Sequence, residues 1–311
     1  MCIAMPLRAE QGTISLVLEN DVFARTDRGY TNGLRWSWLS GPSAPGEPAK
    51  QLANALSLGP SDAVVRGSLE LGQAMYTPDD LSRAQPDPTD RPYAGWLYLA
   101  GGIAAKSDSV LEQFVGSVGV VGRYSGASAT QRKLHRVTGA EAPQGWDAQL
   151  PTEPTLQLFY GRSRRYELTR TALAEVDVIP HAGAALGNVF IYGDVGLSLR
   201  AGRNFAEGFG APRVQPNLPG SDYFRTNGAF GWYVFGGVNG RAVARNLLLD
   251  GSTFEDSPRV KHRPFVGDSQ LGFALTWSGV RLALAHVWRT KEFHGQSYSQ
   301  RFGVISLSLQ Y

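Results

Sequence analysis

The chain has a single cysteine, Cys2, among its 311 residues. An intramolecular disulfide is therefore excluded, and so is a zinc site built from several cysteines. No run of about 18 consecutive apolar residues is present, which excludes a helical membrane protein. The chain also lacks Gly-X-Ser-X-Gly, P-loop and His-Glu-X-X-His motifs, so the usual sequence patterns of serine esterases, nucleotide hydrolases and zinc proteases are missing.

An excess of charge of one sign is also missing. The net charge is +3, the isoelectric point is near 9.0, and the basic residues are scattered, so we do not expect nucleic acid as a partner. Yet 42% of the residues are hydrophobic and only 18% are charged, which is too apolar for a disordered chain. A β-barrel in a membrane gives such an average composition, because lipid-facing apolar residues alternate with polar or small residues that face the lumen.

The clearest alternation lies at the C-terminal end, where Ile305, Leu307, Leu309 and Tyr311 are separated by polar residues. Similar segments predict an all-β fold, an antiparallel transmembrane β-barrel of about 12 strands with a short extracellular loop helix. The predicted strands are residues 13–22, 30–40, 64–76, 93–106, 109–122, 155–165, 174–187, 190–202, 231–246, 264–278, 280–289 and 300–311. Residues 13–311 thus form one predicted barrel domain. Residues 1–12 are interpreted as the remnant of a signal peptide or a disordered N-terminus.

If both termini face the periplasm, the loops after odd-numbered strands share the outer rim. Three of these segments are rich in side chains that can bind ligands or catalyse reactions. The first runs from Glu19 to Gly33, the second from Tyr76 to Trp96, and the third holds residues 128–141 and Gly145-Trp146-Asp147. One segment does not fit this scheme. Residues 203–230 form a long connection on the periplasmic side, where turns are usually short.

The third of these loops contains the segment that is most typical of a helix, Ser128 to Glu141. Ser128 and Gln131 have the spacing of a capping box, in which each side chain satisfies a backbone N–H at the start of a helix. Gly139 suits the left-handed residue that ends one. We therefore predict a capped helix between these residues.

His135 would lie on the same face of this helix as Gln131 and Thr138. A histidine side chain is suited to act as a general base near neutral pH. Glu141 follows six residues later, and a left-handed turn at Gly139 could bring it back toward His135. The plainer interpretation is that both side chains are ordinary solvent-facing groups.

Two further groups of residues are candidates for the same rim. Hard oxygen ligands suit calcium, although Asp and Asn are also common in turns, and the candidates are Asn20, Asp21, Asp27, Thr31 and Asn32. Basic side chains would suit the phosphate groups of a lipid, because guanidinium groups bind phosphate oxygens in pairs. The predicted substrate-binding residues are Arg83, Arg132 and Arg136. Alternation with Ile14, Leu16 and Leu18 predicts that Asn20 points toward lipid while Asp21 points inward.

Several blocks together resemble the lipid A 3′-O-deacylase family, LpxR, in order from about residue 13 to Tyr311. They are Glu19-Asn20-Asp21, Tyr30-Thr31-Asn32-Gly33, Gly72-Gln73 with Tyr76-Thr77-Pro78, Asp90-Arg91-Pro92-Tyr93-Ala94-Gly95-Trp96, His135-Arg136 with Gly139-Ala140-Glu141, and Arg289-Thr290-Lys291-Glu292-Phe293. The resemblance implies a bacterial outer-membrane barrel that removes the 3′-linked acyloxyacyl group from lipid A of lipopolysaccharide and requires calcium (Ca²⁺). We expect it to act as a monomer.

Carried over by position, His135 matches the catalytic base of that family. Asn20, Asp21, Thr31 and Glu141 match residues of its active site, and Asn20 and Asp21 are the expected metal ligands. The implied mechanism has His135 remove a proton from water while calcium stabilises the oxyanion of the ester. Arg83 falls where some members have a lysine that is thought to meet the substrate.

Two alternatives remain open from the sequence. The first is an outer-membrane phospholipase with a serine nucleophile, for which Ser125 and Ser128 are candidates. The second is a porin or structural barrel whose rim motifs only order the loops. Inhibition by a serine-directed reagent would favour the first, and ion conductance without deacylated lipid A would favour the second.

Overall fold

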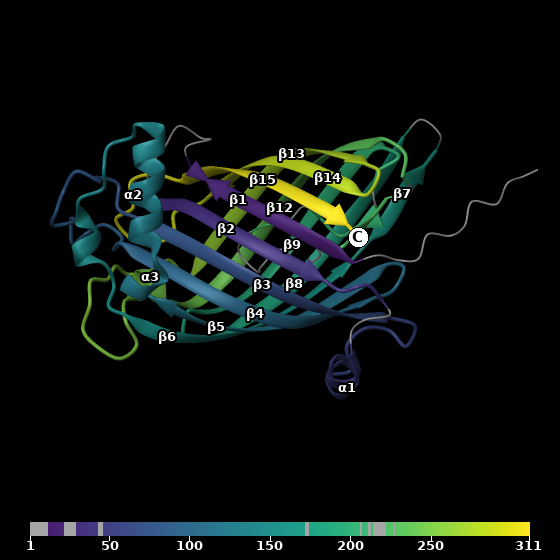
Figure 1. Cartoon of the computed structure of the whole chain (residues 1–311), viewed down its shortest axis with the longest axis horizontal. Coiled ribbons are helices and arrows are strands. Elements are labelled where there is room, and N and C mark those ends of the chain that lie inside the picture. The colour runs from purple at the N-terminus through teal and green to yellow at the C-terminus, as the bar shows by residue number, and fades with distance from the viewer. Residues whose placement is uncertain are drawn as a thin grey trace, which may run out of the picture.

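The computed structural model describes residues 12–21, 29–42, 46–171, 174–205, 207–210, 213, 222–226 and 228–311. In these ranges the chain forms a closed antiparallel barrel (Figure 1). The wall strands are β1 (Thr13–Asn20), β2 (Gly29–Leu39), β3 (Val64–Thr77), β4 (Ala94–Lys106), β5 (Val110–Val121), β6 (Glu153–Arg164), β7 (Tyr166–Arg170), β8 (Glu175–Gly187), β9 (Phe190–Arg203), β12 (Gly231–Asn246), β13 (Phe265–Trp277), β14 (Val280–Arg289) and β15 (Gln300–Gln310).

The barrel has twelve wall positions among the described residues, because β7 continues β6 after Arg165. β8 pairs with β6 through residues 181–187 and with β7 through residues 175–178. β1 pairs with β15, so the first and last strands also meet. Closure leaves no unpaired strand edge, as a wall in lipid requires. The twelve predicted strands are therefore confirmed, with ends that differ by at most a few residues.

Exposed and buried side chains also alternate along the strands as predicted, with apolar side chains on the outer face. In β1, Leu16 is half exposed whereas Val17 is buried, and in β4 Leu99 is 56% exposed between buried neighbours. The exposed apolar side chains of the neighbouring strands continue this surface around the barrel. Lipid contact makes such exposure favourable, whereas in water it would not be.

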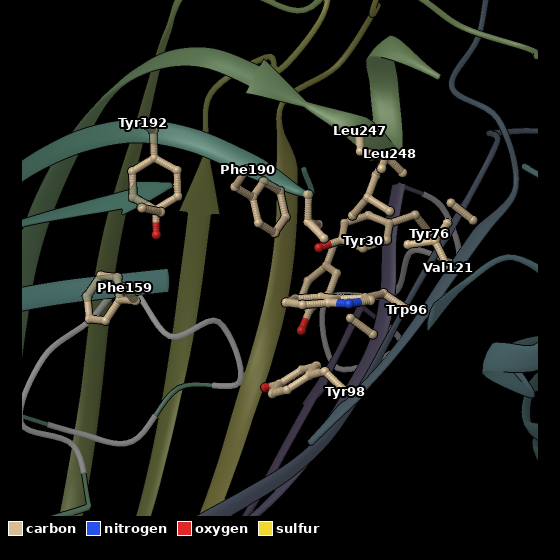
Figure 2. Close-up of a cluster of buried hydrophobic side chains, with 14 of the residues drawn as sticks. Tyr30, Tyr76, Trp96, Tyr98, Val121, Phe159, Phe190, Tyr192, Leu247 and Leu248 are labelled. Atoms are coloured by element: carbon tan, nitrogen blue, oxygen red, sulfur yellow. The ribbon is translucent and has the colours of Figure 1, made fainter. Parts of the chain in front are cut away.

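Aromatic side chains fill one end of the lumen (Figure 2). Trp96 stacks on Tyr98 with ring centroids 4.4 Å apart, and Phe190 meets the edge of Trp96 at 5.8 Å. Leu247 and Leu248 of the short helix α3 (Leu247–Asp250) belong to the same buried cluster. This cluster occupies the lumen near the end opposite the chain termini.

The connection from β9 to β12 explains why residues 203–230 did not fit a short periplasmic turn. Its described parts lie inside the lumen, where β10 (Glu207–Gly208) pairs with β11 (Phe224–Arg225). Asp222 receives two hydrogen bonds of 2.9 Å from Arg35 in the wall. Glu207 pairs with Lys106 at 3.0 Å. This segment is called the plug below, and its described residues contact wall side chains that face the lumen.

The remaining helices lie outside the wall at its two ends. Helix α1 (Gly46–Ala55) connects β2 to β3 at the end where the C-terminus lies, and no feature of the sequence predicted it (Figure 1). The connection from β5 to β6 carries the turn η2 (Arg123–Ser125), helix α2 (Ala127–Thr138) and the turn η3 (Gly145–Ala148) at the opposite end. None of the helices in the described ranges is long and apolar enough to cross a membrane. The predicted N-terminal segment, residues 1–12, lies outside the described residues except for Gly12.

Candidate active site

Helix α2 begins one residue before the predicted start, and its first cap differs from the prediction. The residue that caps it is Gly126, with φ of 72°, which has no side chain, and the N–H of Ala127 donates to the hydroxyl of Ser125 at 3.4 Å. Ser128 therefore lies inside the first turn, and the predicted capping box with Gln131 is wrong. The other end was predicted correctly, because Gly139 is the left-handed cap, and its N–H bonds to the carbonyl of His135.

The start of α2 is held against the outer surface of the barrel wall. Gln73 has the orientation of the exposed residue Leu71, and its side-chain amide donates to the carbonyl of Ser125 at 2.7 Å. Gly95 provides the contact surface on β4: a Cβ atom there would lie 2.3 Å from that of Ala127. Ala127 and Met75 belong to one buried cluster with Trp146. The helix thus lies on the lipid-facing side of the wall, beside its rim.

His135 and Gln131 share a face of α2, as predicted, and this face is buried. The side chain of His135 is 7% exposed, and Gln131, one turn earlier, is 1% exposed. Gln131 accepts a 2.6 Å hydrogen bond from the indole of Trp146, which is itself packed on Tyr93 with ring centroids 5.0 Å apart. The helix is therefore fixed to η3 from its inner face, and the orientation of His135 is fixed with it.

The turn at Gly139 brings Glu141 back to His135, but through its main chain. The carbonyl oxygen of Glu141 lies 2.5 Å from Nδ1 of His135, while the residue as a whole is exposed. A carbonyl oxygen can only accept a hydrogen bond, so Nδ1 carries the hydrogen. In the neutral ring the lone pair is then on Nε2, the nitrogen that a general base would use.

The predicted phosphate-binding residues lie on the same rim and are exposed. Arg132 and Arg136 form the expected i,i+4 pair on the solvent side of α2. Arg83 lies in the β3–β4 loop, whose main chain at Leu81 accepts a hydrogen bond from Gln144. Its guanidinium is 3.7 Å from Asp87. Hydrogen bonds from Thr89, and the charge of Arg83, lower the pKa of that carboxyl.

The ends of β1 and β2 bring the other predicted residues together at this rim. Asn20 is paired with Asn32 across the strands and is half buried in the outward series of Leu16, which confirms its predicted direction. Asp21 follows directly and is 1% exposed. A β-bulge between Tyr30 and Asn32 displaces Thr31, whose hydroxyl lies 2.7 Å from that of Thr77.

The side chains at this strand end carry the types of oxygen atom that bind calcium. Asp21 supplies a carboxylate, Asn20 an amide oxygen and Thr31 a hydroxyl, and calcium takes such oxygen ligands in loose geometry. Among the residues that the structure describes, no group of three or more His, Cys, Asp and Glu side chains could hold a metal ion. Asn32, another predicted oxygen ligand, is buried, and Asp27 lies outside the described residues.

Three residues that build this surface were not singled out from the sequence, although they fall within the quoted motif blocks. They are Gln73, Thr77 and Gly95, which contact Ser125, Thr31 and Ala127 respectively. The feature of the sequence that could have identified these residues is their position in the strands. Each lies near the outer-rim end of a strand, on the face that alternation assigns to lipid, where a polar residue or a glycine is not expected.

A family model and one solved structure agree with this architecture. A family model described as outer membrane protein LpxR matches residues 1–311. LpxR from Salmonella typhimurium has a similar structure, with a TM-score of 0.78 over 96% of this chain and 100% of that chain at 19% sequence identity. The β domain of the Bordetella autotransporter Brka gives a TM-score of 0.47 at 9% identity, covering 98% of this chain and 99% of that one. No curated protein sequence matches.

Proposed function

Since the chain belongs to the LpxR family of outer membrane proteins, we propose that it is a lipid A deacylase. The reaction would be hydrolysis of the ester that links the 3′ acyloxyacyl group to lipid A. The observation that carries this proposal is the place of His135 on the inner face of α2, a helix that packs against the outer surface of the wall beside its rim.

In the proposed mechanism, His135 takes a proton from water through Nε2. The carbonyl of Glu141 holds the ring in the tautomer that this step needs, by accepting the hydrogen of Nδ1. The hydroxide then attacks the ester carbonyl. The alcohol of the sugar leaves with the returned proton, so acid and alcohol form without a covalent intermediate on the protein.

Asn20 and Asp21 would hold a calcium ion, with Thr31 beside them. When bound, calcium would stabilise the negative charge that develops on the ester oxygen. Arg132 and Arg136 would bind phosphate groups of the substrate from the exposed side of α2. Arg83 would act more weakly, because its guanidinium already neighbours Asp87.

A serine nucleophile is less well supported. Ser125 is 1% exposed, and its hydroxyl donates to the carbonyl of Gly122 at 2.6 Å, so this side chain stabilises the turn that precedes α2. Ser128 lies within the first turn of the helix. A porin is also less well supported, because the aromatic cluster and the plug occupy the lumen.

The proposal is tested by mass spectrometry of lipid A from a Gram-negative host that expresses the protein. We expect the wild type to release the 3′ acyl group, and His135→Ala to lower the rate by about 10²- to 10⁴-fold, as loss of a general base does. His294→Ala is the matched control, because His294 is exposed in another loop of the same rim. Unchanged lipid A with the folded wild type, or full activity of His135→Ala, would contradict the proposal.

A further inference from the structure

Arg213 of the plug reaches the strand end that carries the predicted site residues. Its Nε donates a 2.5 Å hydrogen bond to the carboxylate of Glu19, and the two side chains are 2% and 0% exposed. The plug enters the lumen from the opposite end, where Glu207 pairs with Lys106. Arg213 therefore links the interior of the barrel to the end of β1.

Further contacts fix the position of Arg213. Its Nη1 donates to the side chain of Gln270 in β13 at 3.2 Å, and its guanidinium lies 5.2 Å from the ring centroid of Phe302. Phe302 meets Tyr30 edge-on at 5.0 Å, and Arg289 lies over the same ring at 5.4 Å. Arg213 is thus set in a packed layer between strands.

Glu19 connects this packed layer to the proposed reaction site. It lies on the lumen side of β1, directly before Asn20, which lies on the lipid side. Tyr30, which precedes Thr31 in β2, packs against Phe302, the ring over which Arg213 lies. The buried ion pair of Arg213 and Glu19 therefore lies beside both strand ends, and Glu19 directly precedes Asn20 in the chain.

A buried carboxylate needs its cation, because an uncompensated charge away from water is costly. Without Arg213, the buried carboxylate of Glu19 would lose its cation, and its movement toward water would release the end of β1. Reacting groups must be held closely, since a displacement of about 1 Å can cost on the order of 10²-fold in rate.

We propose that Arg213 is a positioning residue for the deacylation site. Through Glu19 it fixes the strand end from which Asn20 and Asp21 extend, so a segment from the periplasmic side of the barrel determines the geometry of a site on the outer surface. This inference rests on the proposed function, and it concerns an interior contact that takes no part in the chemistry itself.

The first test compares two variants in which a charged side chain of the plug is replaced by a neutral one. Arg213→Gln should lower kcat for lipid A by about tenfold while KM changes by less than about twofold, because the geometry of the site is altered and the substrate surface is not. Glu207→Gln is the control, since its partner Lys106 is at the far end of the lumen. It should leave both constants within about twofold of the wild type.

A second readout does not depend on activity. Folding of each variant is first checked by the shift in gel mobility on heating, which should equal that of the wild type. Hydrogen exchange of the backbone from Val17 to Asp21 should then become faster in Arg213→Gln and stay unchanged in Glu207→Gln. In a Glu19→Gln background, Arg213→Gln should change kcat by less than about twofold, since coupled residues are not additive.

The inference is wrong if Arg213→Gln leaves both kcat and exchange unchanged. It is also wrong if Glu207→Gln has the same effect, or if the loss persists undiminished in the Glu19→Gln background. If the wild type does not deacylate lipid A, the proposed function fails, and the exchange experiment alone then decides whether Arg213 holds the end of β1.

Discussion

His135 shows how a single residue depends on main-chain geometry. The i,i+6 spacing to Glu141 would place the two residues far apart around a continuous helix. The left-handed turn at Gly139 reverses the chain instead, and the carbonyl of Glu141 meets Nδ1. The sequence predicted this return, because glycine readily adopts positive φ. It could not predict that a main-chain oxygen, and not the carboxylate, would be the contacting atom.

At the same scale, Asp21 is expected to set the requirement for calcium. Asp21→Asn removes the one carboxylate predicted to bind the ion, so we expect the calcium concentration for half-maximal deacylation to rise by about tenfold or more. Titrating activity with calcium after treatment with a chelator measures this. Asp147→Asn is the control, because Asp147 is exposed in η3 on the same rim. Equal calcium dependence of Asp21→Asn and the wild type would exclude Asp21 as a ligand.

At the scale of elements, the seat of α2 on the wall determines where its histidine lies. That seat depends on Gly95, where an added Cβ would lie 2.2 Å from the hydroxyl oxygen of Ser125. Gln73 and Met75 complete the contact from β3. A shift of the helix start would move His135 relative to Asn20 and Asp21.

We therefore expect Gly95→Val to lower deacylation by at least about tenfold in a barrel that still folds. The matched control is Gly101→Val, on the same strand and with the same orientation, because the nearest atom to an added Cβ there is 3.8 Å away. Activity assays measure the loss of deacylation, and heat-dependent gel mobility shows whether each variant has folded. Similar activity of both variants would show that the seat does not position the helix.

The start of α2 also shows where local sequence rules fail. Ser128 and Gln131 satisfy the spacing of a capping box, yet the helix begins earlier. The reason is the preceding turn, in which the Ser125 hydroxyl bonds to Gly122 and Gly126 adopts positive φ. Because Gln73 then holds the Ser125 carbonyl, a contact with a distant strand decides the cap.

At the scale of the whole molecule, the wall could be predicted and its contents could not. Alternation has a period of two and can be followed along each strand, so the twelve wall strands were found. The plug has no such period. Its position depends on pairs that are far apart in the sequence, such as Arg35 with Asp222 and Glu19 with Arg213, and neither pair has a local signal.

The filled lumen leads to a prediction for the intact barrel. We expect no porin-like conductance in planar lipid bilayers, because the aromatic cluster and the described residues of the plug lie in the lumen. Single-channel recording of the purified protein, with a porin in the same membranes as the positive control, measures this. Stable open-channel steps from the folded protein would contradict it.

The seat of α2 outside the wall also has a kinetic consequence. A substrate that arrives sideways through the leaflet diffuses in two dimensions, so the quantity that governs the proposed reaction is the mole fraction of lipid A in the surface. The molar concentration of lipid A in the suspension as a whole has no direct effect on the rate. Diluting the substrate lipid with inert detergent at constant total lipid A would then slow turnover, and crowding of the leaflet would determine how often each barrel meets a new molecule.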